Sequence, residues 1–393
     1  MIARLRKWLS SRPTRPSRPS ARLAVEELGT RVLPSADIAV LAARLDTPTL
    51  VRFEYQAADT PGPFAVGVYR SADPAFDASD VRVGGVEVTP ALTTGTQVGT
   101  VALAAELPTD LGRRYVLVVA DPGQAVTETS EANNAASFRK LAVAGVAHGL
   151  TLNGLPPAWL APMAAALRAE GYDAAIPFVW TPLSQLPIPG ATVLAGQLLA
   201  GQVRATAAGL AGPNDAVDVH LIGHSRGTSV VSQAFLGLER NPGSRAVRVG
   251  YYTETLLDPH VANNVGGTAA ALAQLAANTG SVPAALLSYD PTRLTARLFA
   301  AGTVAFQAAA QDPAAFAPAS VDRVEVYYQQ LRWDQTAAGS VEQLTGVNFL
   351  APDPSTIRTL GGQTIYATNL SPFGIGHYEV PLYYLASVVP TLG

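Results

Sequence analysis

The chain has 393 residues, of which 48% are hydrophobic and only 15% charged, so it carries enough apolar side chains for a large core and for two domains. A formal net charge of -3 favours no nucleic-acid partner. The absence of cysteine excludes disulfides, a thiol nucleophile and cysteine-bound metal. The sequence contains no uninterrupted run of about 18 or more apolar residues, so we expect no transmembrane segment.

Residues 1–35 are predicted to form a disordered basic and proline-rich segment. Residues 1–22 contain seven basic side chains, no acidic one and prolines at every third position from Pro13 to Pro19. They lack the apolar centre of a secretory signal. Residues 25–35 resemble the LEPR-XLL-type motif of bacterial exported proteins. The resemblance implies an exported or cell-surface protein. The alternative is a disordered tail that carries no targeting signal, on a cytoplasmic protein.

Residues 36–140 show short segments of alternating polar and apolar residues, separated by Gly, Pro and Asp, which predict an antiparallel sandwich. The clearest segments are 37–40, 51–55, 65–69 and 115–119. Residues 69–73 and 128–134 resemble those of CARDB-type domains, which are immunoglobulin-like adhesion modules. That resemblance implies contact with a protein or surface polymer. We interpret Asp73, Asp77 and Asp80 as solvated turn acids rather than as a calcium loop.

From residue 141 the pattern changes to buried strands that alternate with helices. The expected strands are 141–147, 174–180, 217–222, 246–252 and 322–328, and the expected helices are 157–170, 191–210 and 227–239. Alternation of this kind predicts a parallel sheet with right-handed crossovers.

Ser225 is the predicted nucleophile. It stands in Gly223-His224-Ser225-Arg226-Gly227, between an expected strand and an expected helix, which is the setting of a nucleophile elbow. Gly223 and Gly227 leave room for the tight turn. The N–H of Arg226, at the start of the helix, is placed to stabilise an oxyanion. A serine in an ordinary strand-to-helix loop is the alternative.

A second oxyanion donor is expected in the loop after residue 147, since this type of site uses an amide from an earlier strand. His148-Gly149-Leu150 fits that role. Gly149 allows a close backbone approach, and Leu150 offers its N–H. The alternative is a turn in which His148 only caps the loop.

His377 is the predicted base, reached by elimination among the five histidines. His148 belongs to the oxyanion loop, His220 lies inside a buried strand, and His224 adjoins the serine but should point away from its hydroxyl. His260 follows the candidate acid, Asp258, too closely for the fold to place the two side chains separately.

Asp258, within Leu257-Asp258-Pro259, is the predicted acid, because it follows a strand at the carboxyl edge of the sheet. Asp322 stands at the wrong end of a later strand. Asp334, which follows that strand, is the better rival.

Over residues 141–393 the chain resembles the lipases of the α/β-hydrolase superfamily in four motifs, which are His148-Gly149, Gly223-His224-Ser225-Arg226-Gly227, Leu257-Asp258-Pro259 and Gly376-His377. The resemblance implies an α/β-hydrolase fold, with a mostly parallel sheet flanked by helices, behind an N-terminal all-β immunoglobulin-like sandwich. It also implies hydrolysis of a small-molecule or lipid ester through an acyl-serine, with no cofactor and no metal. Residues 261–289 are interpreted either as a lid or as ordinary packed helices.

Two alternatives to an esterase remain from the sequence. An amidase or peptidase would use the same triad, since the elbow does not encode the leaving group. The other is a surface adhesion protein whose hydrolase-like part is inert.

Overall fold

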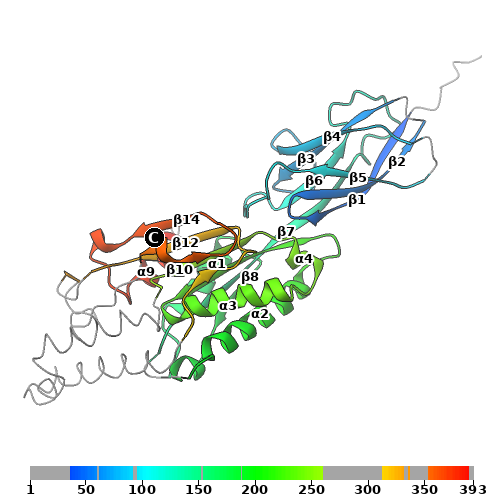
Figure 1. Cartoon of the computed structure of the whole chain (residues 1–393). Coiled ribbons are helices and arrows are strands. Elements are labelled where there is room, and N and C mark those ends of the chain that lie inside the picture. Colours follow the sequence, from blue (N-terminus) through cyan, green and yellow to red (C-terminus); the bar gives the residue numbers. More distant parts are fainter. Residues whose placement is uncertain are drawn as a thin grey trace, which may run out of the picture. The chain divides into compact units, whose positions relative to one another are not determined.

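Strand β7 (Ala135–Ala147) organises the structure, because its two halves pair with different neighbours. Its first half runs antiparallel to β6 (Tyr115–Ala120). Its second half runs parallel to β9 (Ala216–His224) on one side and to β8 (Ala174–Phe178) on the other. Both halves therefore belong to one nine-stranded sheet in the order β14-β12-β10-β9-β7-β6-β3-β4, with β8 beside β7 (Figure 1).

The computed structural model describes residues 36–59, 62–91, 95–151, 154–186, 188–259, 312–331, 335–336 and 353–388. Three expectations fall outside them: the segment 1–35, the 261–289 region and the rival acid Asp334. The same holds for His260.

The remaining strands and the helices have the following bounds. The strands are β1 (Asp37–Thr47), β2 (Leu50–Ala58), β3 (Phe64–Ser71), β4 (Val81–Val88), β5 (Gln97–Ala102), β10 (Tyr252–Leu257), β11 (Phe316–Ala317), β12 (Arg323–Tyr328), β13 (Arg358–Thr359) and β14 (Ile365–Asn369). The α-helices are α1 (Leu160–Ala169), α2 (Ala191–Leu210), α3 (Arg226–Arg240), α4 (Arg245–Arg248) and α9 (Val380–Val388), and the 3-10 helices are η1 (Leu183–Gln185), η3 (Pro354–Thr356) and η4 (Ser371–Phe373).

The antiparallel strands bury one apolar core. β1, β2 and β5 form a three-stranded sheet, and its inward side chains share a buried cluster with those of β3, β6 and β7. Ile38, Phe53, Val68, Val118 and Phe138 are members of this cluster. The alternation of buried and half-exposed positions along β1 and β2 is the physical basis of this packing.

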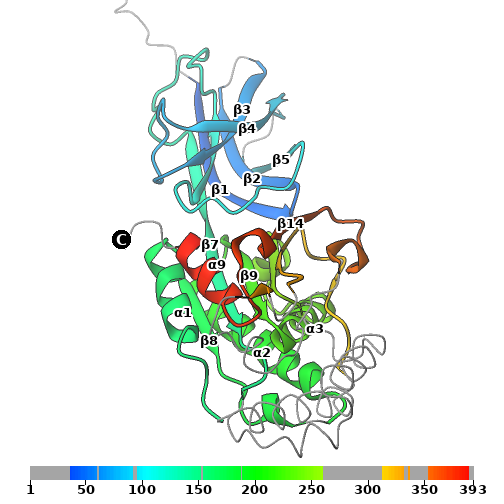
Figure 2. The ribbon, with the colours of Figure 1, turned by 90° about the vertical axis from the view of Figure 1, so that its left-hand side faces the viewer.

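The parallel strands are covered by helices on both faces. Leu199 of α2 and Val230 of α3 belong to the apolar cluster that includes Leu221 of β9. Leu160 of α1 and Val380 of α9 belong to the cluster on the opposite face. Figure 1 shows α2 and α3 side by side, and Figure 2 shows α1 next to α9. β9 is buried at every residue, which places its carboxyl end inside the molecule.

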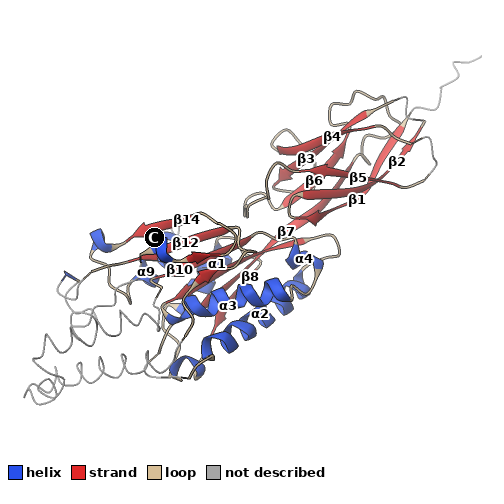
Figure 3. Ribbon diagram, viewed as in Figure 1, coloured by secondary structure: helices blue, strands red, loops and turns tan. Residues whose placement is uncertain are grey.

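The expected fold class is wrong. The structure is mostly β, with 36% strand against 25% helix, and its nine-stranded sheet is mixed and curled into half a barrel rather than parallel. Only five α-helices lie in the described parts of the chain (Figure 3). The reason lies in β7: its apolar run continues from one strand pattern into the other, so antiparallel and parallel strands join in one sheet.

The predicted domain boundary between residues 140 and 141 falls inside β7, and the division at that point stays a prediction. Residues 246–252, expected as a strand, instead contain α4, and the strand β10 begins only at Tyr252. In the ranges described above, no helix is both long and apolar enough to cross a bilayer.

Candidate active site

Ser225 occupies the sharp turn between β9 and α3. Its φ of 53° and ψ of -123° lie in a region that non-glycine residues rarely adopt. Its N–H donates to the carbonyl of Leu257 over 3.0 Å, and its own carbonyl accepts the Thr228 hydroxyl over 2.6 Å. These hydrogen bonds hold a strained residue in place at the carboxyl end of a buried strand.

The two glycines of the motif stand where the backbone leaves no room for a side chain. A Cβ at Gly223 would lie 2.4 Å from the carbonyl oxygen of Gly227, and one at Gly227 would lie 2.4 Å from that of Ala147. Both distances are far below van der Waals contact. The turn therefore packs directly against the end of β7.

The loop after β7 brings Gly149 against the serine. A Cβ at Gly149 would lie 2.7 Å from the Ser225 Cβ and 3.1 Å from its Oγ, so only glycine fits there. His148 is fully buried, and its Nδ1 donates to the Gly149 carbonyl over 2.7 Å. Leu150 follows and is half-buried. The structure thus places the expected oxyanion loop beside the expected nucleophile.

Asp258 and His377, which are 119 residues apart, form a buried pair. His377 Nδ1 donates to Asp258 Oδ2 over 2.5 Å, and the two side chains are 3% and 0% exposed. Asp258 follows β10 and accepts two further hydrogen bonds from Gln329, one from its backbone N–H at 3.1 Å and one from its side-chain amide at 3.2 Å. The acid is therefore fixed between two strand ends.

His224 connects this pair to the serine turn. Its Nε2 donates to the carbonyl oxygen of His377 over 2.9 Å, and the two imidazole rings lie 4.8 Å apart between centroids. The imidazole of His377 is thereby held next to the residue that precedes Ser225.

Burial lowers the pKa of His377 to about 3, so the imidazole is neutral at pH 7. With its one proton on Nδ1 toward Asp258, the neutral ring presents Nε2 as a proton acceptor. This is the protonation state that a general base requires.

The other candidates lie elsewhere. His220 is a buried structural residue, hydrogen-bonded to the Tyr172 hydroxyl over 2.8 Å and to the Thr255 hydroxyl over 2.7 Å. Asp322 precedes β12 and accepts the backbone N–H of Tyr252, at the opposite end of the strands from Asp258.

The Arg226 side chain is buried, at 5% exposure. Its guanidinium pairs with Asp312 through Nε–Oδ2 and Nη2–Oδ1 contacts. Neither Asp312 nor Gln329 was predicted from the sequence. Gln329 had one usable signal, since it directly follows a strand that neighbours the strand of the acid.

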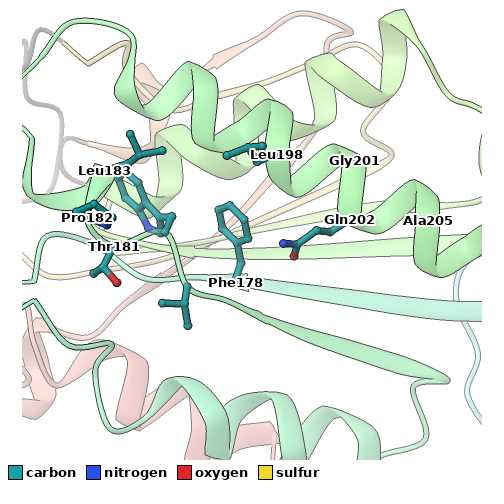
Figure 4. A pocket seen from close by; sticks show the side chains of 10 residues that line it. Phe178, Thr181, Pro182, Leu183, Leu198, Gly201, Gln202 and Ala205 are labelled. Atoms are coloured by element: carbon teal, nitrogen blue, oxygen red, sulfur yellow. The ribbon is translucent and has the colours of Figure 1, made fainter.

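An apolar hollow lies beside Trp180, between the end of β8 and helix α2 (Figure 4). Its volume is about 450 Å³, and its walls include Phe178, Leu183, Leu198 and Gly201. The Trp180 indole N–H donates to the His148 carbonyl over 2.7 Å, which joins this wall to the loop beside the nucleophile. The hollow is large enough for an apolar substituent of a small ligand.

The site combines a serine hydroxyl on a strained backbone, a neutral imidazole and a buried carboxyl group. That set is suited to nucleophilic acyl transfer. Among the residues with a described placement, no three His, Asp or Glu side chains gather as metal ligands do.

Comparisons with known proteins identify no family. No protein-family model and no curated protein matches the chain. Among solved structures, the cell-surface multi-modular chitinase ChiW of Paenibacillus sp. str. FPU-7 is 9% identical, with 84% of this chain and 27% of that chain covered and a TM-score of 0.18. The β-glucuronidase of Parabacteroides merdae is 9% identical, with 80% and 39% covered and a TM-score of 0.17. The chain thus spans less than two fifths of either protein, and likenesses this weak carry no argument about fold or activity.

Proposed function

We propose that the protein is a serine hydrolase that cleaves carboxylic esters. The observation that carries this proposal is the buried hydrogen bond of His377 to Asp258, next to a serine held at a strained positive φ. Buried titratable groups with a charged partner, and residues with a strained backbone, are enriched at catalytic sites, where the mechanism requires them.

In the proposed reaction, Nε2 of His377 takes the proton of Ser225 as Oγ attacks the ester carbonyl carbon. The carbonyl oxygen becomes an oxyanion, which the backbone N–H groups of Arg226 and Leu150 stabilise. The C–O bond to the alcohol then breaks, and His377 gives its proton to the departing alkoxide. Water, deprotonated by the same imidazole, attacks the acyl-serine and releases the acid.

Asp258 supports the imidazole as it becomes positively charged. A lone buried carboxylate would be costly, but hydrogen bonds from Gln329 and His377 compensate it. Asp258→Asn should lower the rate because it removes the negative charge that stabilises imidazolium.

Hydrolysis of p-nitrophenyl esters by purified wild type, Ser225→Ala and His377→Ala tests the proposal. We expect either substitution to lower kcat by roughly 10³-fold or more, because neither residue has a substitute at the site. Ser79→Ala, in the antiparallel part, serves as the matched serine control and should keep full activity. Equal turnover in all four proteins would contradict the proposal.

Labelling with a fluorophosphonate probe gives an independent measurement, because the probe reacts with an activated serine whatever the natural leaving group. We expect labelling that disappears in Ser225→Ala. If the labelled protein cleaves p-nitroanilides (amides of p-nitroaniline) in preference to p-nitrophenyl esters, the protein is an amidase. Absence of labelling would favour a binding protein.

A further inference from the structure

The guanidinium of Arg226, the residue that follows the proposed nucleophile, lies at the centre of a buried network. Besides its contacts with Asp312, it donates to the carbonyl of Ser184 over 2.7 Å and to that of Leu186 over 3.2 Å. Its carbon Cζ lies 5.3 Å from the centre of the Trp180 ring, within cation–π range. The side chain thus ties the start of α3 to the segment around η1.

Asp312 is the anionic half of this arrangement, at 1% exposure. Its Oδ1 accepts from Arg226 Nη2 over 3.0 Å and from the Thr192 hydroxyl over 3.1 Å, while its Oδ2 accepts from Arg226 Nε. A two-point contact of this kind fixes the orientation of a guanidinium as well as its position. The contact therefore also restrains the backbone of Arg226.

The same network reaches the oxyanion loop. The Ser184 hydroxyl lies 3.3 Å from that of Thr151, and the Gln185 side-chain amide donates to the Thr151 carbonyl over 2.9 Å. Thr151 directly follows Leu150. One continuous set of buried hydrogen bonds therefore joins residue 226 to the neighbour of residue 150.

We propose that the buried Arg226–Asp312 ion pair sets the spacing of the two oxyanion amides, with Asp312 as a positioning residue. This inference rests on the proposed ester hydrolysis. Arg226 contributes its backbone N–H to the oxyanion and its side chain to the network, and η1 transmits the same constraint to the loop of Leu150. The desolvation of two charges offsets much of the Coulomb energy of a buried ion pair, so the fixed geometry of the pair is the contribution on which this inference rests.

The inference predicts a rate effect without a binding effect. Oxyanion donors act on charge that develops in the transition state, so a displaced donor lowers kcat and leaves substrate binding nearly unchanged. A boronic acid that forms a tetrahedral adduct on Ser225 should report the same loss, because its oxygen occupies the oxyanion position.

The experiment compares wild type with Asp312→Asn, which keeps the shape of the side chain and removes its charge. We expect kcat on p-nitrophenyl acetate to fall by roughly 10- to 100-fold, the boronic acid inhibition constant to rise by a similar factor, and KM to change by less than about 3-fold. Asp173→Asn is the matched control, since it breaks the Arg114–Asp173 ion pair of 2.7 Å far from the serine turn. It should change thermal stability but neither kinetic constant.

Unchanged kcat and inhibition constant in folded Asp312→Asn would overturn the inference, as would a rise in KM alone. If Asp312→Asn does not fold, the Thr151→Val variant tests the inference instead. It removes only the hydroxyl contact to Ser184, and we expect kcat and the inhibition constant to shift in parallel by roughly 3- to 10-fold. No shift in either constant would again overturn the inference. Failure of the proposed function is distinguished by the wild type itself, which would then neither hydrolyse esters nor react with the fluorophosphonate.

Discussion

At the scale of single residues, Ser225 shows a conflict between stability and chemistry. Its positive φ costs free energy that any residue with a Cβ must bear, whereas glycine adopts such angles freely. Asp258 has a φ of 44°, so two members of the proposed triad share this property. The backbone conformation at these positions serves the placement of the side chains.

The strain at residue 225 is measurable by comparing two inactive variants. We expect Ser225→Gly to have a free energy of unfolding about 1 kcal/mol higher than Ser225→Ala, because glycine relieves the strain and alanine keeps it. Urea denaturation of both proteins measures the difference. A lower stability of the glycine variant would show that the turn carries no strain.

The site residues were predictable from sequence to unequal degrees. Ser225 was identified from its flanking glycines, and His377 by elimination among five histidines. Both arguments are local or compositional. The hydrogen bond between His377 and Asp258, and those from Gln329, bridge at least 71 residues, and no local pattern encodes such partners.

At the scale of elements, the packing of α2 on α3 depends on a small residue at the crossing. A Cβ at Gly196 would lie 2.6 Å from the Gln233 Cβ and 2.8 Å from the Val230 carbonyl oxygen. In the same helix, a Cβ at Gly201 would meet only the Arg204 guanidinium, at 4.0 Å. The two glycines therefore have different roles.

A pair of alanine substitutions separates these roles. Gly196→Ala should destabilise the protein by about 1–3 kcal/mol, because it forces the two helices apart. Gly201→Ala should stabilise it by about 0.5–1 kcal/mol, because alanine favours the helix and nothing opposes it. Both shifts are read from urea denaturation midpoints. Equal effects would mean that the crossing tolerates a methyl group.

Helices and buried strands were predictable where periodicity is strong. Residues 191–210 were expected as a helix and form α2, and residues 227–239 lie within α3. The expectation failed at 246–252, where four residues form α4 before the strand begins. A short apolar run fits a helix or a strand equally well, so its neighbours in space decide.

At the scale of the whole molecule, buried titratable groups with opposite pKa shifts govern stability against pH. Burial raises the pKa of Glu254 from 4.5 to about 8, while Ser232 donates to its Oε1 over 2.8 Å. Burial lowers the pKa of His220 from 6.5 to about 4. Between pH 4.5 and 6.5, the folded protein therefore binds one proton more than the unfolded chain at Glu254 and one proton fewer at His220.

Asp322 and His377 shift in the same two directions, to about 8 and about 3. Together these shifts predict a stability plateau between pH 4.5 and 6.5, where the losses from Glu254 and Asp322 cancel the gains from His220 and His377. The stabilisation from Glu254 is complete below pH 4.5 and lost as pH rises toward 8, at about 1.4 kcal/mol per pH unit once His220 no longer offsets it. The contribution of His220 is complete above pH 6.5 and lost as pH falls through 4. Denaturation midpoints measured against pH test this profile.

Glu254→Gln should reduce the alkaline decline between pH 6.5 and 8 by about half, since glutamine does not titrate and Asp322 still does. Glu87→Gln, on the exposed face of β4, is the control and should leave the decline unchanged. An unaltered slope in Glu254→Gln would contradict the assignment. Asp322, whose pKa burial also raises to about 8, accounts for any residual slope of the same sign.

The sequence by itself determined the positions of the main helices and strands and the motif around Ser225, because periodicity and steric demands act over a few residues. Only the tertiary structure decided that β7 joins antiparallel and parallel strands in one sheet, which overturned the expected fold class. It alone also decided which buried charges meet, as in Arg226 with Asp312. A strand pattern records whether each face is buried but does not name the strand beside it, and a charged residue carries no local sign of its partner.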